Sequence, residues 1–332
     1  MSGEDRFVRR LRSEISGLGG SGRVLVGPGD DAAVVAGSPR PQVVTTDLVV
    51  EGVDFLPGED PEAIGRRAMA VNLSDLAAMG ASPAFFVLAI GFPARLGEEY
   101  ALAVARGALS RAIPAGAALA GGDLSDSERT VVSIALWGEP AGKPLLRSGA
   151  RADDRLFLSG EPGRAAAGLR IARESRGSAN PSNEDRRELL AAYRDPEPRL
   201  AIGLALAKEL GATAAIDVSD GLGIDASRLA GASGVRAVLH ADRLPISPPL
   251  ARFAAEEGLD PLELVLSGGD DYELLFTVSP ENEARIPREL GGVPLRRIGE
   301  METGSGAILR ANGVDREISL LGHDHLRDDL KR

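Results

Sequence analysis

The stretch NLSDLAAMGASPAFFVLAIGF, residues 72–92, passes from an Ala-rich segment with helical period into an apolar run that favours a strand. We expect the helix to span residues 61–79, because Asp60 can cap its free amides and Pro61 suits the first helical position. Asn72 and Asp75 are three residues apart and therefore share one face of this helix. The stretch therefore predicts a helix on which Asn72 and Asp75 could together line a functional site.

Outward from this stretch, Val- and Ile-rich runs alternate with Ala-rich stretches of helical period, which is typical of an α/β or α+β protein with helices packed on sheets. Strands are expected at 24–26, 32–35, 43–50, 85–91, 131–137, 155–158, 214–217, 235–239, 272–278 and 307–310. Further helices are expected at 97–113, 162–174, 186–193, 199–210, 224–232 and 248–257. Residues 138–154 interrupt the pattern with Gly, Pro and charge, so we expect two domains, 1–145 and 146–332.

The bulk composition excludes several kinds of partner and chemistry. The 332 residues include 38 Lys and Arg against 49 Asp and Glu, and the net charge of −11 argues against a nucleic acid or an anionic membrane as partner. The absence of cysteine excludes disulfides, thiolate zinc sites and cysteine nucleophiles. The longest apolar run is too short to span a bilayer and the first residues contain no apolar signal core, so we expect a soluble, cytoplasmic protein.

Six short segments place aspartates beside glycine, serine or threonine at the ends of apolar runs. They are GPGDDAAVV from Gly27, TTDLVVEGVDF from Thr45, NLSDLAAMG from Asn72, GGDLSDS from Gly121, DVSDGLG from Asp217 and SGGDDYELL from Ser267. Carboxylates that recur in this way predict one anionic site gathered from distant parts of the chain. Hard divalent cations, above all Mg²⁺, fit such oxygen donors and commonly bridge to substrate phosphates. The pattern therefore favours metal-assisted phosphate chemistry.

Each segment also has a simpler structural interpretation. GPGDDAAVV and SGGDDYELL can be turns, because Gly, Pro and Asp dominate turns. In DVSDGLG, Ser219 or Asp220 can cap a helix, although the same turn has free amides that could receive phosphate oxygens. GGDLSDS is expected to end a strand, where α/β proteins place ligand-binding loops. The triplet Thr45, Thr46 and Asp47 interrupts an apolar strand that we expect to be buried, and the cost of burying these groups favours a ligand role.

The motifs that are missing narrow the chemistry further. The sequence contains no G-x-x-x-x-G-K-[ST] loop and no protein-kinase signature. The three histidines, His240, His323 and His325, have no metal-ligand spacing. Histidine catalysis is therefore not expected, and positioning and charge neutralisation by metals can carry the catalysis.

In this order the motifs resemble the thiamine-monophosphate kinase family, whose superfamily includes aminoimidazole ribonucleotide synthetase (PurM), selenophosphate synthetase and HypE. The resemblance rests on G-D-D-A-A, T-T-D-x-x-V-E-G-V, N-L-S-D-L-A-A-M-G-A, G-G-D, R-S-G-A-R, D-x-S-D-G-L, S-G-G-x-D-Y-E-L and a closing G-x-D-H, and covers almost the whole chain. It implies a PurM-like two-domain fold, in which the mixed sheet of the N-terminal domain forms a barrel across a homodimer and an α/β domain follows. It also implies binding of ATP and several Mg²⁺ ions.

The resemblance assigns roles by position. It implies metal ligands at Asp30, Thr45, Thr46, Asp47, Asp75, Asp123, Asp217 and Asp220, of which Asp30, Asp47, Asp75, Asp217 and Asp220 are also expected to be catalytic. It implies ATP contacts at Thr46, Gly122, Asp123, Arg147 and Ser219. The acceptor substrate is expected at Asp54, Asp270 and His323.

The three acceptor positions are those at which this chain departs from the family pattern. The family has His in V-E-G-V-H-F where this chain has Asp54, Glu in S-G-G-E-D-Y where it has Asp270, and an aromatic residue where it has His323. Asp270 is one methylene shorter than Glu, and the imidazole of His323 can still stack on an aromatic ring. Asp54 would repel an acceptor phosphate unless it is protonated or bridged by a metal.

The implied reaction is in-line transfer of the γ-phosphoryl group of ATP to thiamine monophosphate, giving thiamine diphosphate and ADP. An acceptor phosphate with a second pKa near ~6 is mostly deprotonated at neutral pH and needs no protein base. Two alternatives stay open: a paralogue with another phosphorylated acceptor, and a non-catalytic Mg-ATP-binding protein. Selenophosphate synthetase and HypE are disfavoured because their characteristic cysteines are absent, and the helix and S-G-G-x-D-Y-E-L motifs fit aminoimidazole ribonucleotide synthetase less well.

Overall fold

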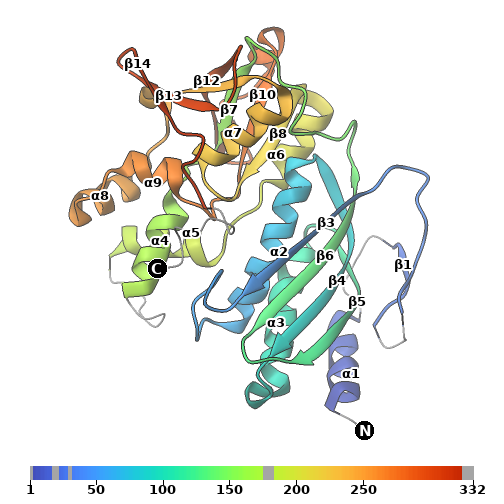
Figure 1. The fold of residues 1–332 in the computed structure, drawn as a ribbon. Coiled ribbons are helices and arrows are strands. Elements are labelled where there is room, and N and C mark those ends of the chain that lie inside the picture. The colour runs from blue at the N-terminus through green and yellow to red at the C-terminus, as the bar shows by residue number, and fades with distance from the viewer. Residues whose placement is uncertain (1–2, 17–21, 29–31, 175–182, 324–332) are drawn as a thin grey trace.

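The computed structural model describes residues 3–16, 22–28, 32–174 and 183–323, which form two domains, each built on one large sheet (Figure 1). The helices are α1 (Gly3–Ile15), α2 (Pro61–Ala78), α3 (Gly97–Ala112), α4 (Arg164–Glu174), α5 (Glu184–Arg194), α6 (Leu200–Ala205), α7 (Leu222–Ser233), α8 (Pro248–Glu257) and α9 (Pro261–Ser267). The strands of the first domain are β1 (Val24–Val26), β2 (Val34–Val35), β3 (Val43–Val50), β4 (Ala81–Phe92), β5 (Ala118–Asp126) and β6 (Val131–Pro140). Those of the second are β7 (Arg155–Ser159), β8 (Ala212–Val218), β9 (Arg236–His240), β10 (Glu273–Val278), β11 (Glu289–Leu290), β12 (Val293–Glu302), β13 (Ala307–Ala311) and β14 (Val314–Glu317).

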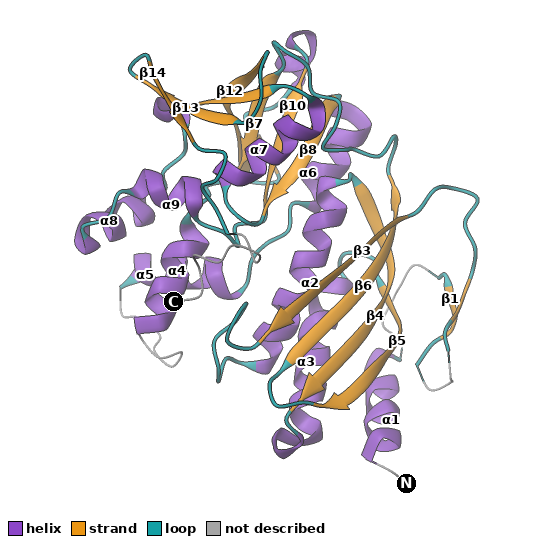
Figure 2. Ribbon diagram, in the orientation of Figure 1, coloured by secondary structure: helices purple, strands orange, loops and turns teal. Residues whose placement is uncertain are grey.

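The N-terminal domain contains a mixed four-stranded sheet in the order β3-β6-β4-β5, in which only β4 and β5 are parallel. Helices α2 and α3 cover one face of this sheet, and α1 packs against α3 (Figure 2). Strands β1 and β2 form a separate ribbon beside β5. The opposite face of the sheet carries exposed apolar side chains of β3, including Val44 and Leu48.

The C-terminal domain contains an eight-stranded sheet in the order β14-β13-β9-β12-β7-β10-β8, with β11 paired to β12. All neighbours are antiparallel except β13 and β9. Helix α7 packs on β8, β9 and β13, and the α4–α5 pair packs against α8 and α9. The boundary expected at residue 145 falls in the segment between β6 and β7, which belongs to no strand of either sheet.

Helix α2 is the element that joins the two domains, because it packs against β3, β4 and β6 on one side and against α6, β8 and β10 on the other. The expected start signal is confirmed: the Asp60 side chain accepts a hydrogen bond from the amide of Ala63, and Pro61 follows it. Fourteen of the 18 helical residues are buried, so the helix is covered on nearly every side. A Cβ on Gly65 would lie 1.9 Å from the carbonyl oxygen of Val104, so this glycine allows α3 to approach closely.

The structure confirms most of the predicted elements and corrects several. Strand β3 and helix α8 have the predicted bounds, whereas strands β11, β12 and β14 and helix α9 were not predicted. The helix expected at 199–210 is interrupted, because α6 ends at Ala205 and a π-helical turn, Leu206–Leu210, follows. Short 3-10 helices lie at Ala94–Leu96, Ala241–Arg243 and Pro280–Arg285.

Two expectations about strands were wrong in ways that affect the site. The strand expected to end at Gly121, Gly122 and Asp123 does not end there, since β5 begins at Ala118 and continues through Asp126 along β4. β3 is not a buried strand, because it forms an edge of its sheet and alternate residues of it are exposed. In the part of the chain that the structure describes, no helix is long and apolar enough to cross a lipid bilayer.

Candidate active site

A cleft of about 810 Å³ between the two domains brings together most of the predicted site residues. The N-terminal domain lines it with β3, the turn that follows and one face of α2, and the C-terminal domain lines it with α4, the turn after β8 and the loop before β10. The predicted residues in its lining are Asp47, Asp54, Asp75, Asp217, Ser219, Asp220, Asp270 and His323. Four of the six motifs therefore contribute to one cleft, although their segments lie up to more than 200 residues apart.

The deepest acidic group of the cleft lies where β3 crosses α2. The hydroxyl of Thr45 donates a hydrogen bond to the Asp75 carboxylate. Burial, followed by the negative charge of Asp75, raises the pKa of Asp47 to about 7. A carboxylate with so high a pKa is costly to ionise unless a cation joins it, so this corner of the cleft is suited to bind one.

The C-terminal domain adds a third carboxylate, Asp217, from the end of β8. Its Oδ2 accepts a hydrogen bond of 2.7 Å from the buried hydroxyl of Ser74, the neighbour of Asp75 on α2. Burial and then the charge of Asp75 raise the pKa of Asp217 to about 7, while the hydrogen bond from Ser74 lowers it. Arg147, which the resemblance assigned to ATP, is exposed and also lowers the pKa of Asp217 through its charge.

The turn after β8 differs from its expected form. The amides of Ser219, Asp220 and Gly221 are not free to receive phosphate, because all three donate to Oδ2 of Asp225 at 3.0–3.2 Å. Neither Ser219 nor Asp220 caps α7, whose first turn is held by this internal carboxylate instead. The sequence reasoning missed Asp225, although its place in the first turn of a helix after a Ser-Asp pair is a recognisable signal. Asp220 is also paired with the Arg228 guanidinium.

The loop between α9 and β10 holds Asp270 at the cleft and uses Asp271 for the fold. The Asp271 carboxylate accepts from the amides of Gly163 at 2.7 Å and Ala165 at 3.3 Å, at the start of α4. Asp270 Oδ1 accepts from the hydroxyl of Tyr272 at 2.9 Å, and Oδ2 accepts from Arg67 at 3.2 Å. The segment is a loop without a regular turn, and only the first of its two aspartates lines the cleft.

The remaining acceptor positions, Asp54 and His323, line the same cleft. Asp54 Oδ2 accepts a 2.8 Å hydrogen bond from the amide of Val50, which closes the turn after β3. The amide of His323 donates to the carbonyl oxygen of Asp220, also at 2.8 Å, and places this residue beside the turn after β8. Asp54 stands where the family has His, and in this chain its carboxylate stabilises the turn after β3.

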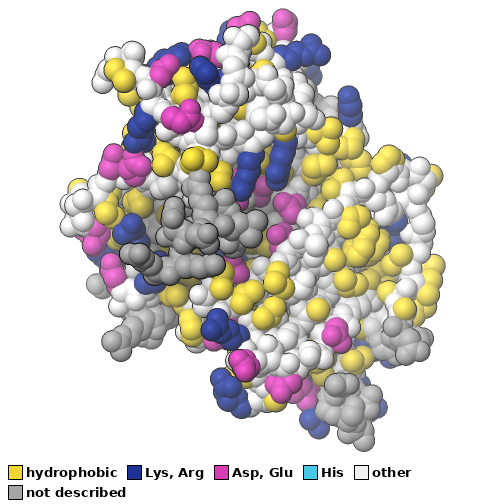
Figure 3. Space-filling model, viewed as in Figure 1, with side chains coloured by type: hydrophobic (Ala, Val, Ile, Leu, Met, Phe, Trp, Pro, Cys, Tyr) yellow, Lys and Arg dark blue, Asp and Glu magenta, His cyan; other side chains and the backbone are white. Residues whose placement is uncertain are grey.

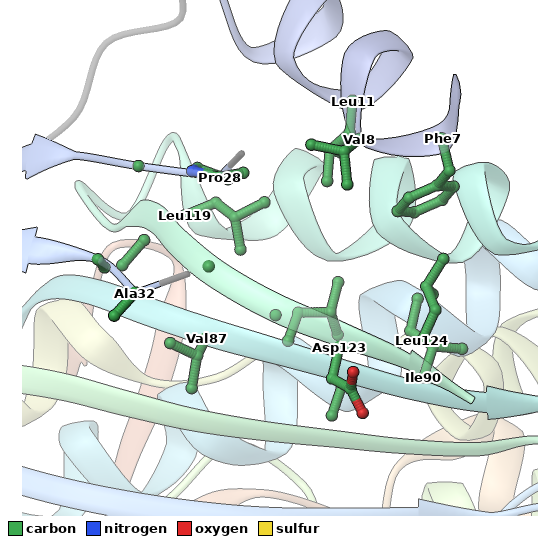
Figure 4. A pocket seen from close by; sticks show the side chains of 17 residues that line it. Phe7, Val8, Leu11, Pro28, Ala32, Val87, Ile90, Leu119, Asp123 and Leu124 are labelled. Carbon is green, nitrogen blue, oxygen red and sulfur yellow. The ribbon is translucent and has the colours of Figure 1, made fainter. Parts of the chain in front are cut away.

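Gly122 and Asp123 lie outside the cleft, in a second cavity of about 590 Å³ (Figure 4). Its walls are β4, β5, α1 and the segment around Pro28, and its labelled side chains are mostly apolar, with Asp123 as the acidic exception. Gly122 allows β5 to lie against β4, because a Cβ there would be 2.0 Å from the carbonyl oxygen of Leu88. An apolar wall with one carboxylate fits a ring and a metal-bound phosphate better than it fits a bare anion.

Three predicted metal ligands among the described residues are absent from the cleft lining, namely Thr45, Thr46 and Asp123. Thr46 alternates with Thr45 and Asp47 along β3, and its exposed side chain donates to the carbonyl oxygen of Ile134 at 3.0 Å on the neighbouring strand. Asp30 lies outside the described residues. Sequence reasoning also missed Arg67 and Ser74, although Arg67, Val71 and Asp75 follow one another at the four-residue spacing of a helix face.

The donor set fits a hard divalent cation. Carboxylates of Asp47, Asp75 and Asp217 and the hydroxyl of Thr45 supply only oxygen atoms, as Mg²⁺ prefers, and the raised pKa values of Asp47 and Asp217 mark a deficit of positive charge. Among the described residues, no three His, Asp or Glu side chains are already arranged closely enough to enclose an ion. An ion at this site would therefore share its coordination with ligand oxygens and water.

Two family models match the chain. Residues 29–139 match the AIR synthase related protein, N-terminal domain, and residues 151–312 match the C-terminal domain. A curated relative, thiamine-monophosphate kinase of Rhodopirellula baltica, is 38% identical over 310 residues, which cover 90% of this chain and 89% of that protein.

Solved structures agree with this match. The crystal structure of thiamine-monophosphate kinase from Stenotrophomonas maltophilia K279a has a TM-score of 0.82 and 34% identity, and the match covers 93% of this chain and 96% of that one. A structure of AaThiL complexed with AMPPCP and TMP has a TM-score of 0.77 and 30% identity and covers 96% of both chains. Both matches extend over the two domains described above.

Proposed function

The chain belongs to the thiamine-monophosphate kinases of the AIR synthase related family, and from that premise we propose how its cleft performs the ATP-dependent phosphorylation of thiamine monophosphate. The reaction is transfer of the γ-phosphoryl group of ATP to the acceptor phosphate. An oxygen of that phosphate forms the new bond to the γ-phosphorus in line with the bond to ADP, which breaks. The observation that carries this proposal is the convergence of Asp47, Asp75 and Asp217 from both domains on one cleft.

We propose that these three carboxylates hold Mg²⁺, with Thr45, Thr46, Asp123, Asp220 and Asp30 as the further ligands implied by the family. Bound Mg²⁺ would neutralise phosphate charge and let the two anionic substrates approach one another. Asp47 and Asp217 come from different domains, so ligands held by both fix the distance between the domains. Because the acceptor phosphate is already mostly ionised at neutral pH, the cleft needs no general base, and no histidine is required beside the carboxylates.

We place the nucleotide along β5 and the turn after β8. The second cavity supports this placement, since its apolar wall offers a surface for a ring while Asp123 faces the same space (Figure 4). Ser219 and Arg147 lie on the C-terminal side, and a guanidinium at Arg147 is suited to pair with phosphate oxygens. AaThiL, the relative crystallised with AMPPCP and TMP, matches this chain over both regions.

We place the acceptor at the other end of the cleft, at Asp54, Asp270 and His323. All three line it together with Arg67 and Tyr272. The bond from the Val50 amide to Asp54 directs one carboxylate oxygen toward the main chain, which lessens the repulsion that a free carboxylate would exert on an acceptor phosphate. This geometry supports thiamine monophosphate as a substrate even though His is replaced by Asp54.

We propose that the exposed face of the four-stranded sheet binds a second copy of the chain. Hydrophobic side chains gather on this face over β3 and its neighbours (Figure 3), where Val44 and Leu48 are each 55% exposed. Exposed apolar side chains on a sheet face are typical of a protein interface. A dimer measured by light scattering, and its dissociation by Leu48→Glu, would support this assembly, whereas a monomeric wild type would exclude it.

The decisive test of the function is incubation of the purified protein with Mg-ATP and thiamine monophosphate, with thiamine diphosphate and both adenine nucleotides measured. We expect stoichiometric thiamine diphosphate and ADP. Release of AMP, or ADP formation that does not depend on the acceptor, would contradict the proposal. Replacement of thiamine monophosphate by other phosphorylated acceptors in the same assay measures the acceptor preference. The cytoplasm, which supplies ATP and Mg²⁺, is the compartment in which we expect the enzyme to work.

A further inference from the structure

Arg67 is the most deeply buried cation of the cleft, since only 2% of its surface is exposed. It projects from α2 of the N-terminal domain and reaches the C-terminal domain at two points. Its Nη2 donates to Oδ2 of Asp270 at 3.2 Å, and its guanidinium carbon lies 4.5 Å from the ring centre of Tyr193 on α5. The side chain therefore connects the helix that bears Asp75 with the loop that bears Asp270.

The guanidinium of Arg67 has few hydrogen-bond partners, although its charge is buried. Its Nε and Nη1 have no hydrogen-bond partner among the described residues. Burial, the largest single effect, lowers the pKa of the guanidinium, but the charges of Asp270 and, after it, Tyr272, Tyr193 and Glu59 together outweigh burial, and the pKa of Arg67 lies above its ordinary value. Asp270 is the only carboxylate that forms a salt bridge with it in the described part of the chain, so the ion pair of this buried charge is made by a residue of the predicted acceptor site.

Asp270 in turn depends on its neighbours to hold its position. Its φ is +66°, and that of Tyr272 is +52°, in the left-handed region that non-glycine residues rarely adopt. The amides of Asp270 and Tyr272 donate to the carbonyl oxygens of Ser219 and Val218, and the Tyr272 hydroxyl fixes the second carboxylate oxygen. Such strain persists only where surrounding contacts hold it, and Arg67 is the contact that comes from the opposite domain.

The positions of Arg67 and Asp75 along α2 define two ends of the cleft. Arg67 and Asp75 are eight residues apart on one helix face, which corresponds to about 12 Å along the axis. One end of the cleft therefore binds cations through Asp75, and the other end holds a fixed carboxylate through Arg67. An acceptor that reaches from the first end toward the second would meet Asp270 in a set orientation.

We propose that Arg67 is a positioning residue for acceptor binding, which acts through Asp270 and does not touch the reacting phosphates. The inference rests on the proposed function, because Asp270 is placed at the acceptor by that proposal. Arg67 fixes the carboxylate that receives the distal part of thiamine monophosphate, and the Tyr272 hydroxyl assists it. Its loss weakens the binding of the acceptor and leaves ATP binding unchanged.

The test compares Arg67→Met, Arg67→Lys and Tyr272→Phe with wild type, by steady-state kinetics in both substrates and by calorimetric titration of thiamine monophosphate. Since a hydrogen bond to a charged group is involved, we expect Arg67→Met to raise KM for thiamine monophosphate about 10- to 100-fold. KM for ATP should stay within about twofold. Arg67→Lys should recover part of the loss because it retains the charge, and Tyr272→Phe should give a smaller shift of the same kind.

Tyr193→Phe is the matched control, because it removes only the hydroxyl that donates to Glu59 at 3.2 Å and keeps the ring beneath the guanidinium. It should leave both KM values unchanged. Thermal unfolding of each variant separates lost binding from lost structure, and Tyr272→Phe tests the same claim if Arg67→Met does not fold.

An unchanged KM for thiamine monophosphate in Arg67→Met, or an equal rise in both KM values, would overturn the inference and leave the proposed function intact. A wild-type protein that neither binds nor phosphorylates thiamine monophosphate would overturn both.

Discussion

The hydroxyl of Ser74 donates a 2.7 Å hydrogen bond to Oδ2 of Asp217, which joins the middle of α2 to the end of β8. Both residues are buried, so this bond between the domains is shielded from water. It places the carboxylate of Asp217 against the helix that carries Asp75. The acidic corner of the cleft therefore forms when the two domains pack, before any cation is present.

Loss of the Ser74 hydroxyl should weaken this contact between domains. We expect Ser74→Ala to lower the free energy of unfolding by about 1–3 kcal/mol at pH 8, because a buried carboxylate loses its donor. Urea unfolding of wild type and variant measures the change. Ser110→Ala is the control, since its exposed hydroxyl donates only to the carbonyl of Gly107 in its own helix. Equal stability of Ser74→Ala and wild type would show that water replaces the hydroxyl.

Removal of the negative charge of Asp75 should increase the stability of the metal-free protein but decrease its activity. The charge of Asp75 raises the pKa values of both Asp47 and Asp217, so Asp75→Asn relieves repulsion in the metal-free protein. We expect the variant to be more stable in EDTA by on the order of 1 kcal/mol and to lose at least about 100-fold in turnover. Thermal unfolding with and without Mg²⁺ tests this, because Mg²⁺ should stabilise wild type far more than the variant. A variant less stable than wild type in EDTA would contradict the argument.

The buried Asp271 should give the fold a dependence on pH. Burial raises the pKa of Asp271 well above 3.8, against the opposing hydrogen bonds from the Gly163 and Ala165 amides. The folded state then keeps a proton that the unfolded chain has released, so stability falls as pH rises from about 4 through the raised pKa. We expect Asp271→Asn to make the fall of unfolding free energy with rising pH shallower, while Asp47 and Asp217, whose pKa values burial raises to about 7, keep the remaining slope. Asp260→Asn, which alters a helix cap at an exposed position, should retain the wild-type slope.

The two glycines of the G-G-D motif should differ in their effect on folding. A Cβ on Gly122 would meet the Leu88 carbonyl oxygen at 2.0 Å, whereas a Cβ on Gly121 meets nothing within 4 Å. Gly122→Ala should cost about 1–3 kcal/mol, because β4 and β5 must separate to make room. Gly121→Ala should stay within about 0.5 kcal/mol of wild type. Chemical unfolding measures both, and any loss of ATP binding in Gly121→Ala then reports on the cavity and not on the fold.

Local signals predicted the elements whose sequence determines them. Helix α8 and strand β3 have the predicted bounds, and Asp60 caps α2 as expected, because in each case the pattern lies within the element. β12 was missed because VPLRRIGEME mixes charges into a strand that is buried mainly by its neighbours. GGDLSDS was misassigned because glycines typical of a loop here serve the close approach of two strands.

The carboxylates of the site could be predicted from the sequence, but their partners could not. The Ser-Asp and Gly-Asp motifs mark Asp75, Asp217 and Asp270 by composition alone. The contacts that hold them are made by Ser74 and Arg67, and depend on how α2 packs between the two domains. No local pattern contains that packing, because the paired residues are 143 and 203 positions apart.

The carboxylate of Asp225, which gathers three successive amides, makes the turn after β8 rigid before any ligand arrives. A loop that is already ordered loses little conformational entropy on binding, so more of the contact energy appears as affinity. With the nucleotide placed as proposed, the same rigidity limits adaptation, because a bulkier nucleotide could not be accommodated by reshaping this turn. A change of nucleotide specificity would have to arise elsewhere, along the open wall beside β5.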